Sequence, residues 1–262
     1  MLFNCLLFSL LPLLVSSTTT NTTNSTNTTN TTNITNITFN NLPNTLQIQQ
    51  IAPKSLSCLP CSPDCRTAHQ ATPFIASSLK KYKIHDLNTT AALLALMAFE
   101  SVDFRYKHNV FPGRPGQGTV NMQSSNFNLL YAKSIPALKP LVASIPFSSV
   151  EGLKNETLNA ILGLVTPDEY NFGSAAWFLV KQCGRDVLKA LQQDLEGGFE
   201  AYMKCVGVEV SEERRVYLER AKKAFGLDSW PLTLERGELQ HSQRQTVEGK
   251  TCWVHILSQM DV

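Results

Sequence analysis

The hydrophobic residues of this chain fall into runs with helical spacing, and most of these runs lie between residues 70 and 226. Thr72-Pro73 looks like an N-cap followed by a first-turn proline, which predicts a helix that continues to about Ile84. A second helix, capped by Asn88 or Thr89, carries the apolar run 91–99. Further helices are predicted over 127–134, 148–164, 166–181, 185–195, 197–205 and 212–225.

Local signals set several of these boundaries. Ser148 with Glu151, and Thr166 with Glu169, have the spacing of capping boxes, and Gly226 ends the last helix. Only residues 115–125 favour a small hairpin. The predicted fold class is therefore mainly α, a helical bundle with a small hairpin or loop lobe.

Residues 1–17 form a short apolar run that ends in small residues. The run is too short to span a bilayer, so we expect a cleaved signal peptide; an uncleaved anchor is the alternative. No later run approaches the roughly 18 apolar residues of a spanning helix, so we expect no membrane span after cleavage. These features predict a secreted protein, located outside the cell or in the cell wall.

Residues 18–54 form a polar arm in which Asn or Thr occupies 22 of the 28 positions from 18 to 45. Such a segment cannot bury enough apolar surface to fold, so we expect it to be disordered. Its repeated Asn-x-Thr unit predicts N-glycosylation, with an unmodified spacer as the alternative. The folded domain is predicted over 55–226, where two more sequons occur, and the periodicity of the tail 227–262 is weak. The predicted acceptors are Asn21, Asn24, Asn27, Asn30, Asn33, Asn36, Asn88 and Asn155.

Six cysteines remain after removal of residues 1–17, and an oxidising compartment favours disulfides over a metal or redox site. Cys183 and Cys205 fall on predicted helices and are the expected pair. The pairing of the other four stays open. Three of them lie close together in the sequence and cannot all pair among themselves, so at least one must pair with a cysteine elsewhere. These four are Cys58, Cys61, Cys65 and Cys252.

Charge and motifs exclude several classes of function. The chain has 23 basic and 21 acidic residues, a net charge of +2, so we expect no nucleic-acid partner. The five histidines lack metal-ligand spacing, and Gly116-x-Gly118 lacks the third glycine of a dinucleotide fingerprint. We therefore expect no metal, no cofactor and a monomeric state.

Glu100 is the candidate catalytic residue. It follows the apolar run 91–99 and shares a helical face with Leu93, Leu96 and Met97, so burial should raise its pKa. A carboxylic acid that stays protonated near neutral pH can serve as a general acid. The alternative is a glutamate at the edge of the apolar stripe with its carboxylate in water.

Three short motifs follow in order: Glu100-Ser101, then Met122-Gln123 after a glycine-rich loop, then Tyr170-Asn171 before Gly173. This order resembles the lysozyme-like superfamily, nearest the soluble lytic transglycosylase and goose-type lysozyme branch. The resemblance covers roughly residues 88–182. Three residues are inserted before Met122-Gln123, and Phe172 is inserted before the last glycine.

The resemblance implies an α+β lysozyme-like fold with a cleft, and cleavage of β-1,4-linked amino-sugar polymers, peptidoglycan before chitin. Glu100 would be the acid, and Ser101, Gln123, Tyr170 and Asn171 would contact the polysaccharide. Asp103 would be the second carboxylate of a hydrolase, although a solvated aspartate is favoured there.

The sequence is also compatible with two other classes of function. One is a secreted binding or effector protein that keeps the lysozyme-like fold without catalysis. The other is a structural cell-wall protein displayed on the glycosylated arm.

Overall fold

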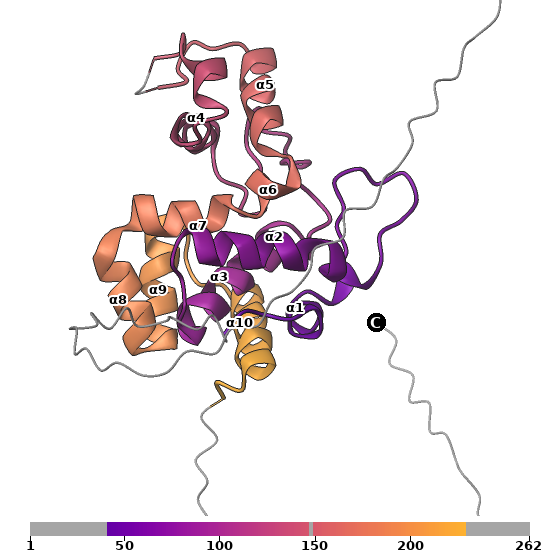
Figure 1. Cartoon of the computed structure of the whole chain (residues 1–262), viewed down its shortest axis with the longest axis vertical. Coiled ribbons are helices and arrows are strands. Elements are labelled where there is room, and N and C mark those ends of the chain that lie inside the picture. The colour runs from indigo at the N-terminus through magenta and orange to yellow at the C-terminus, as the bar shows by residue number, and fades with distance from the viewer. Residues whose placement is uncertain (1–40, 147–148, 229–262) are drawn as a thin grey trace, which may run out of the picture. The chain divides into compact units, whose positions relative to one another are not determined.

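The computed structural model describes residues 41–146 and 149–228, and these residues are mainly helical (Figure 1). Among them no strand forms; two isolated antiparallel bridges link His108 to Gly118 and Gly118 to Gln123. The 3-10 helices are η1 (Pro53–Leu56) and η2 (Lys139–Val142), and η3 (Leu179–Cys183) is a π-helical turn. The α-helices are α1 (Thr45–Ile51), α2 (Ala68–Lys81), α3 (Leu87–Glu100), α4 (Ser125–Ser134), α5 (Asn155–Val165), α6 (Asp168–Asn171), α7 (Ser174–Phe178), α8 (Gly184–Gln193), α9 (Leu195–Val206) and α10 (Glu212–Phe225).

Helix α3 is the centre of the main hydrophobic cluster. Every residue from Thr89 to Ala98 is buried, because α1, α8, α9 and α10 all pack against this helix. A helix that is apolar all round is buried all round. The sequence pattern predicts one buried face, but in the structure the whole middle of the helix is buried.

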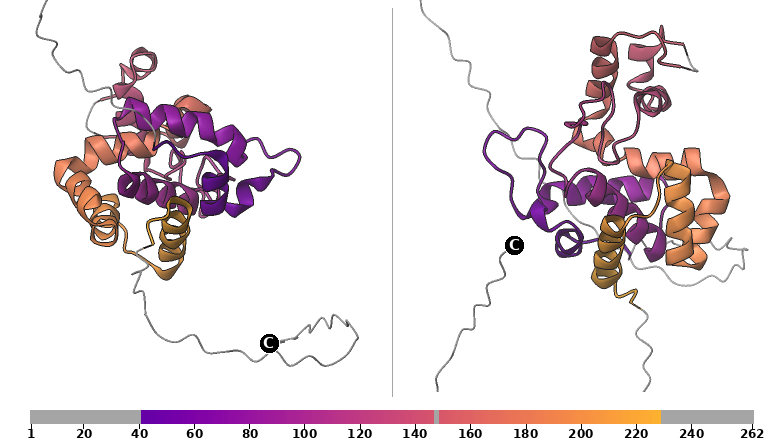
Figure 2. Two further views of the ribbon diagram at one scale, coloured as in Figure 1. Left: turned by 60° about the horizontal axis from the view of Figure 1, so that its bottom comes forward. Right: turned by 180° about the vertical axis from the view of Figure 1, so that it is seen from behind.

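A second hydrophobic cluster lies between α4, α5 and α7. Figure 1 shows α4 and α5 side by side, and Tyr131 of α4 stacks at an angle on Trp177 of α7, with 5.0 Å between ring centroids. Both views of Figure 2 show α8 and α9 as a second adjacent pair.

Several predicted boundaries are wrong. Helix α2 begins at Ala68, where Thr67 and Gln70 form a capping box, and it passes through Pro73. Helix α5 begins at Asn155, after Lys154, and not at a capping box near residue 148. An ordered helix, α1, also forms before the predicted domain boundary at residue 55.

The predicted helix 166–181 is interrupted. It divides into α6, α7 and the π-helical turn η3, and Gly173 lies between the first two. A Cβ atom at Gly173 would lie 2.6 Å from the hydroxyl oxygen of Tyr131. The hairpin predicted over 115–125 is also absent, and its place is taken by turns and the two isolated bridges.

Candidate functional site

Glu100, the last residue of α3, forms an ion pair with a helix that lies far along the chain. Its Oε1 atom accepts a hydrogen bond of 2.8 Å from Nη2 of Arg214 in α10, and the two side chains are only 17% and 16% exposed. The Arg214 guanidinium also lies over the ring of Phe99, 4.4 Å from its centroid. The carboxylate is therefore neutralised and held in place.

Burial raises the pKa of Glu100, as the sequence predicts, and the hydrogen bond and charge of Arg214 act in the opposite direction. A buried carboxylate that lost this guanidinium would be strongly destabilising as an ion. The role that the structure shows for Glu100 is to join α3 to α10.

The chain turns sharply just after Glu100. Val102, Asp103 and Phe104 all have left-handed backbone conformations, with φ between 53° and 65°. Such conformations cost free energy in non-glycine residues, so the surroundings must hold them. Ser101 helps to do so, because its hydroxyl donates to the Met97 carbonyl at 2.6 Å and accepts from the Phe104 amide at 2.8 Å.

Asp103 is buried, with 1% of its surface exposed. Its Oδ2 atom accepts a hydrogen bond of 2.9 Å from the Lys54 amide. Burial is the main cause that raises the pKa of Tyr217 to about 12, and a hydrogen bond with Asp103 acts in the same direction. The expectation of a solvated aspartate is therefore wrong.

The structure brings together only some of the predicted site residues. Glu100 and Gln123 both line a cavity of about 310 Å³. Ser101 is fully buried as the cap of α3, and neither Tyr170 nor Asn171 lines that cavity. The Tyr170 carbonyl accepts a hydrogen bond from Tyr131. Asn171 is buried, and its carbonyl accepts a hydrogen bond from the Ser174 hydroxyl.

Sequence reasoning missed a buried network of amides beside this cavity. Asn121 accepts a hydrogen bond of 2.7 Å from Ser174, and Gln123 donates one of 2.8 Å to Asn128. Asn128 in turn donates to the Gly116 carbonyl at 2.8 Å. These bonds satisfy polar groups that would otherwise be costly to bury, and they fix the loop before α4.

A second cavity, of about 240 Å³, lies between the loop that follows η1 and the loop that follows α3. Its lining is mostly apolar and includes one arginine, Arg105, whose Nε atom is buried without a hydrogen-bond partner. We call this cavity the loop pocket. Its lining residues are Leu59, Ser62, Pro63, Asp64, Cys65, Arg105, Tyr106, His108 and Val110.

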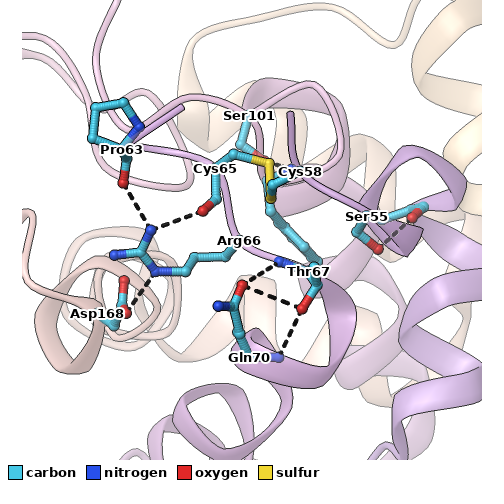
Figure 3. The surroundings of a disulfide bond; sticks show 11 residues. Ser55, Cys58, Pro63, Cys65, Arg66, Thr67, Gln70, Ser101 and Asp168 are labelled. Atoms are coloured by element: carbon cyan, nitrogen blue, oxygen red, sulfur yellow. Dashed lines mark hydrogen bonds and ion pairs between the residues drawn. A yellow bond between two sulfur atoms is a disulfide. The ribbon is translucent and has the colours of Figure 1, made fainter. Parts of the chain in front are cut away.

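Covalent and ionic bonds fix one wall of the loop pocket. A disulfide joins Cys58 to Cys65, and the Arg66 guanidinium reaches Asp168 at 2.7 Å, as Figure 3 shows. Lys107 also contacts Asp168, at 2.6 Å. Burial acts to raise the pKa of Asp168, but hydrogen bonds from the two cations outweigh it, and the pKa is lowered.

Asp64 joins the two loops directly. Its Oδ2 atom accepts a hydrogen bond of 3.1 Å from the Lys107 amide and lies 2.5 Å from Nδ1 of His108. The sequence shows only that polar and apolar residues alternate around Arg105. That these residues face the loop 59–65 depends on long-range folding, so no local signal identified this pocket.

The remaining predicted sites divide between described and undescribed residues. Asn88 lies in the first turn of α3 and Asn155 is the first, exposed residue of α5. The six acceptors from Asn21 to Asn36 lie outside the described residues, as do residues 1–17 and Cys252. The structure pairs Cys183 with Cys205, the pair that the sequence analysis predicts, and leaves Cys61 free and exposed.

Neither a metal site nor a spanning helix occurs in the described parts of the chain. In these parts no group of three or more His, Cys, Asp or Glu side chains could hold a metal ion. Among the same residues, every helix is too short or too polar to cross a bilayer.

Comparisons with known proteins give one informative result. A bifunctional dioxygenase (DOX)-epoxy alcohol synthase (EAS) of Fusarium oxysporum (strain Fo5176) is 54% identical to this chain over 159 residues. The match covers 60% of this chain but only 12% of the length of that relative. No protein family and no solved structure matches the chain.

This relative contradicts the resemblance to the lysozyme-like superfamily, because its name describes oxygen chemistry and not glycoside cleavage. The expected glycosidase activity and the polysaccharide partner are therefore wrong, and the non-catalytic lysozyme-like alternative is no better supported. Short motifs in the right order carried that resemblance. The structure also argues against the resemblance, since Glu100 is bound by Arg214 and neither Tyr170 nor Asn171 lines the Glu100 cavity. Of the predicted fold, the mainly helical class is confirmed.

Proposed function

We propose that this chain is a ligand-binding module of an oxygenase system, and that its loop pocket binds an unsaturated, largely apolar compound with an anionic head group, such as a fatty acid. The observation that carries this proposal is the 54% identity with a dioxygenase–epoxy alcohol synthase. Because the match covers 12% of that relative, only the chemistry of the ligand is carried over, and no oxygen-transfer step is assigned to these residues.

The chemistry of the named product sets the class of ligand. An epoxide is a three-membered ring of one oxygen and two carbons, and its two carbons come from a carbon–carbon double bond. A ligand of this pathway is therefore an alkene or an oxygenated derivative of one. Small-molecule sites that bind such compounds are mostly apolar, with a few polar groups that orient the ligand.

The loop pocket has this composition. Leu59, Tyr106 and Val110 supply apolar contact surface, and Arg105 supplies a cation. The guanidinium of Arg105 could pair with a bound carboxylate through charge-assisted hydrogen bonds. At about 240 Å³ the pocket is small, so it would hold the head and first part of a chain-like ligand.

Arg105→Gln tests this assignment. The variant should bind a long-chain unsaturated fatty acid about tenfold more weakly, since one charge-assisted hydrogen bond contributes roughly 1.4 kcal/mol or more. Titration calorimetry with the full chain measures the affinity. The methyl ester of the same acid should bind both proteins equally, because it lacks the anionic head.

Two further variants control the result. Arg105→Lys keeps the charge and should recover part of the affinity. Arg215→Gln removes a guanidinium that contacts Glu200 and Glu212 on α9 and α10, away from the pocket lining, and should have no effect. Absence of saturable binding, or equal binding by the unmodified chain and Arg105→Gln, would overturn the proposal.

We also propose that the chain is secreted, with residues 1–17 as its signal peptide and a glycosylated polar arm that ends before α1. Two disulfides, Cys58–Cys65 and Cys183–Cys205, support passage through an oxidising compartment. Expression in a fungal host, followed by detection of the chain in the medium and treatment with an N-glycosidase, tests this. A chain that stays in the cell at its unglycosylated mass would contradict it.

A further inference from the structure

One cysteine thiol is free and exposed at the edge of the loop pocket. The structure uses four cysteines in disulfides, and Cys61 is free and exposed on the short loop that Cys58–Cys65 closes. The chain has seven cysteines, and the two others are Cys5, within the predicted signal peptide, and Cys252.

An exposed apolar surface lies beside this thiol. Leu59 is 67% exposed, Val110 is 56% exposed and Phe111 is 91% exposed. Leu59, Val110 and Ser62, the residue after Cys61, line the same pocket, so the two loops form one surface. Exposed apolar side chains gathered in this way mark an interaction site.

We propose that the segment Cys252–Leu257 of this same chain docks on this surface, and that a Cys61–Cys252 disulfide secures it. The segment reads Cys-Trp-Val-His-Ile-Leu, and it contains no acidic residue, no lysine and no arginine. The residues from 235 to 251 include six that are charged, so a polar stretch separates this apolar segment from the described part of the chain. The aromatic ring and three aliphatic side chains of this segment match the apolar surface that Leu59, Val110 and Phe111 expose.

The tail is long enough to make this contact. The described chain ends at residue 228, and the 23 residues up to Cys252 can extend to about 80 Å. A folded domain of this size has a radius of gyration of about 16 Å, so the whole surface of the domain is within reach.

The bond forms by thiol–disulfide exchange. Two thiols, Cys61 and Cys252, give up two protons and two electrons and form one sulfur–sulfur bond. A low-molecular-weight disulfide such as oxidised glutathione takes them up and becomes two thiols. No ligand is needed, so this inference does not depend on the proposed function.

Disulfide mapping of the secreted full chain tests the proposal. Free thiols are alkylated first, the protein is digested without reduction, and peptides are identified by mass spectrometry. We expect a peptide pair joined through Cys61 and Cys252 that disappears on reduction. In Cys252→Ser, Cys61 should become fully alkylated, while Cys58–Cys65 and Cys183–Cys205 stay intact as internal controls.

A second experiment separates docking from a chance tether. The reduced chain is reoxidised with a glutathione mixture, and the rate at which the Cys61–Cys252 bond forms is followed by alkylation. Phe111→Ser should slow this rate about tenfold, because docking then buries one aromatic ring fewer. Leu141→Ser, which changes an exposed leucine of η2, is the matched control and should not slow it.

Three outcomes would overturn the proposal. Alkylated Cys61 and Cys252 in the oxidised secreted chain would exclude the bond. A dimer joined through Cys61, seen on a non-reducing gel, would show that a second copy is the partner. Equal rates for Phe111→Ser and the unmodified chain would show that the segment does not dock on this surface.

Discussion

Asp168 pairs with two cationic side chains from other parts of the chain. It accepts hydrogen bonds from Arg66 and Lys107, so it ties the loop before α2 and the loop after α3 to the start of α6. Lys107 also donates to the Thr166 carbonyl at 3.1 Å, and its side chain is 8% exposed. A lysine buried to this extent needs its partner, since an unpaired buried charge is strongly destabilising.

Asp168→Asn should therefore destabilise the protein in a pH-dependent way. Because the folded-state pKa of Asp168 is lowered, its stabilisation is complete above the unfolded pKa, near 4, and is lost as the pH falls through the folded value. We expect a loss of about 1–3 kcal/mol at pH 7. The difference between variant and unmodified protein should shrink as the pH falls below about 4. Urea unfolding at a series of pH values measures it.

A matched acid provides the control for this experiment. Asp186 also lies in the first turn of a helix, α8, but it is exposed. Asp186→Asn should leave the pH profile almost unchanged. If both variants lost the same stability at every pH, the Arg66–Asp168–Lys107 cluster would not be the source of the effect.

Some of these residue environments can be predicted from the sequence. Asp168 and Glu169 are recognisable as first-turn acids of a helix, and the burial of Glu100 follows from the apolar run before it. The partners of both acids lie far away: Lys107 is 61 residues from Asp168, and Arg214 is 114 residues from Glu100. Local patterns carry no information on such pairs.

At the scale of elements, α8 and α9 are joined by the single residue Asp194 and pack against each other. Gly198 makes this possible, because a Cβ atom there would lie 2.4 Å from the Cα atom of Leu191. The obstacle is backbone, which cannot move aside as a flexible side chain can.

Gly198→Ala should therefore lower the free energy of unfolding by about 1–3 kcal/mol, as overpacking in a close helix pair does. Gly163→Ala is the control: it lies within α5, and a Cβ atom there meets nothing within 4 Å. That change should be neutral or should stabilise by up to about 1 kcal/mol. Thermal unfolding followed by circular dichroism compares the two, and a stable Gly198→Ala variant would show that the helices can separate without cost.

Helices with their own caps were predictable, and helices shaped by packing were not. Helix α10 occupies the predicted range 212–225 between Ser211 and Gly226, both of which act as caps. By contrast, α6, α7 and η3 form one continuous run in the sequence pattern, but in the structure α6 and α7 are separate helices on either side of Gly173, which Tyr131 of α4 approaches closely. The loop pocket was unpredictable for the same reason, because two loops about 45 residues apart form it.

At the scale of the whole molecule, the Cys183–Cys205 disulfide joins the π-helical turn η3 to the last turn of α9. The chain between these cysteines forms α8 and α9, so the bond closes the helix pair at its open end. Cys183 and Cys205 both pack against the second hydrophobic cluster, which includes Trp177 and Phe178. Opening the bond should therefore loosen the contact between the α8–α9 pair and α7.

Replacing both cysteines by alanine should lower the free energy of unfolding by about 3 kcal/mol. This value follows from the loop-closure entropy of a 22-residue separation, which the bond removes from the unfolded chain. Guanidinium unfolding of the variant and of the unmodified chain measures the loss. Hydrogen exchange should then be faster in α8 and α9 than in α3, whose middle is buried on every side. Exchange that increases equally in all three helices would mean that the bond stabilises the whole chain and not this pair.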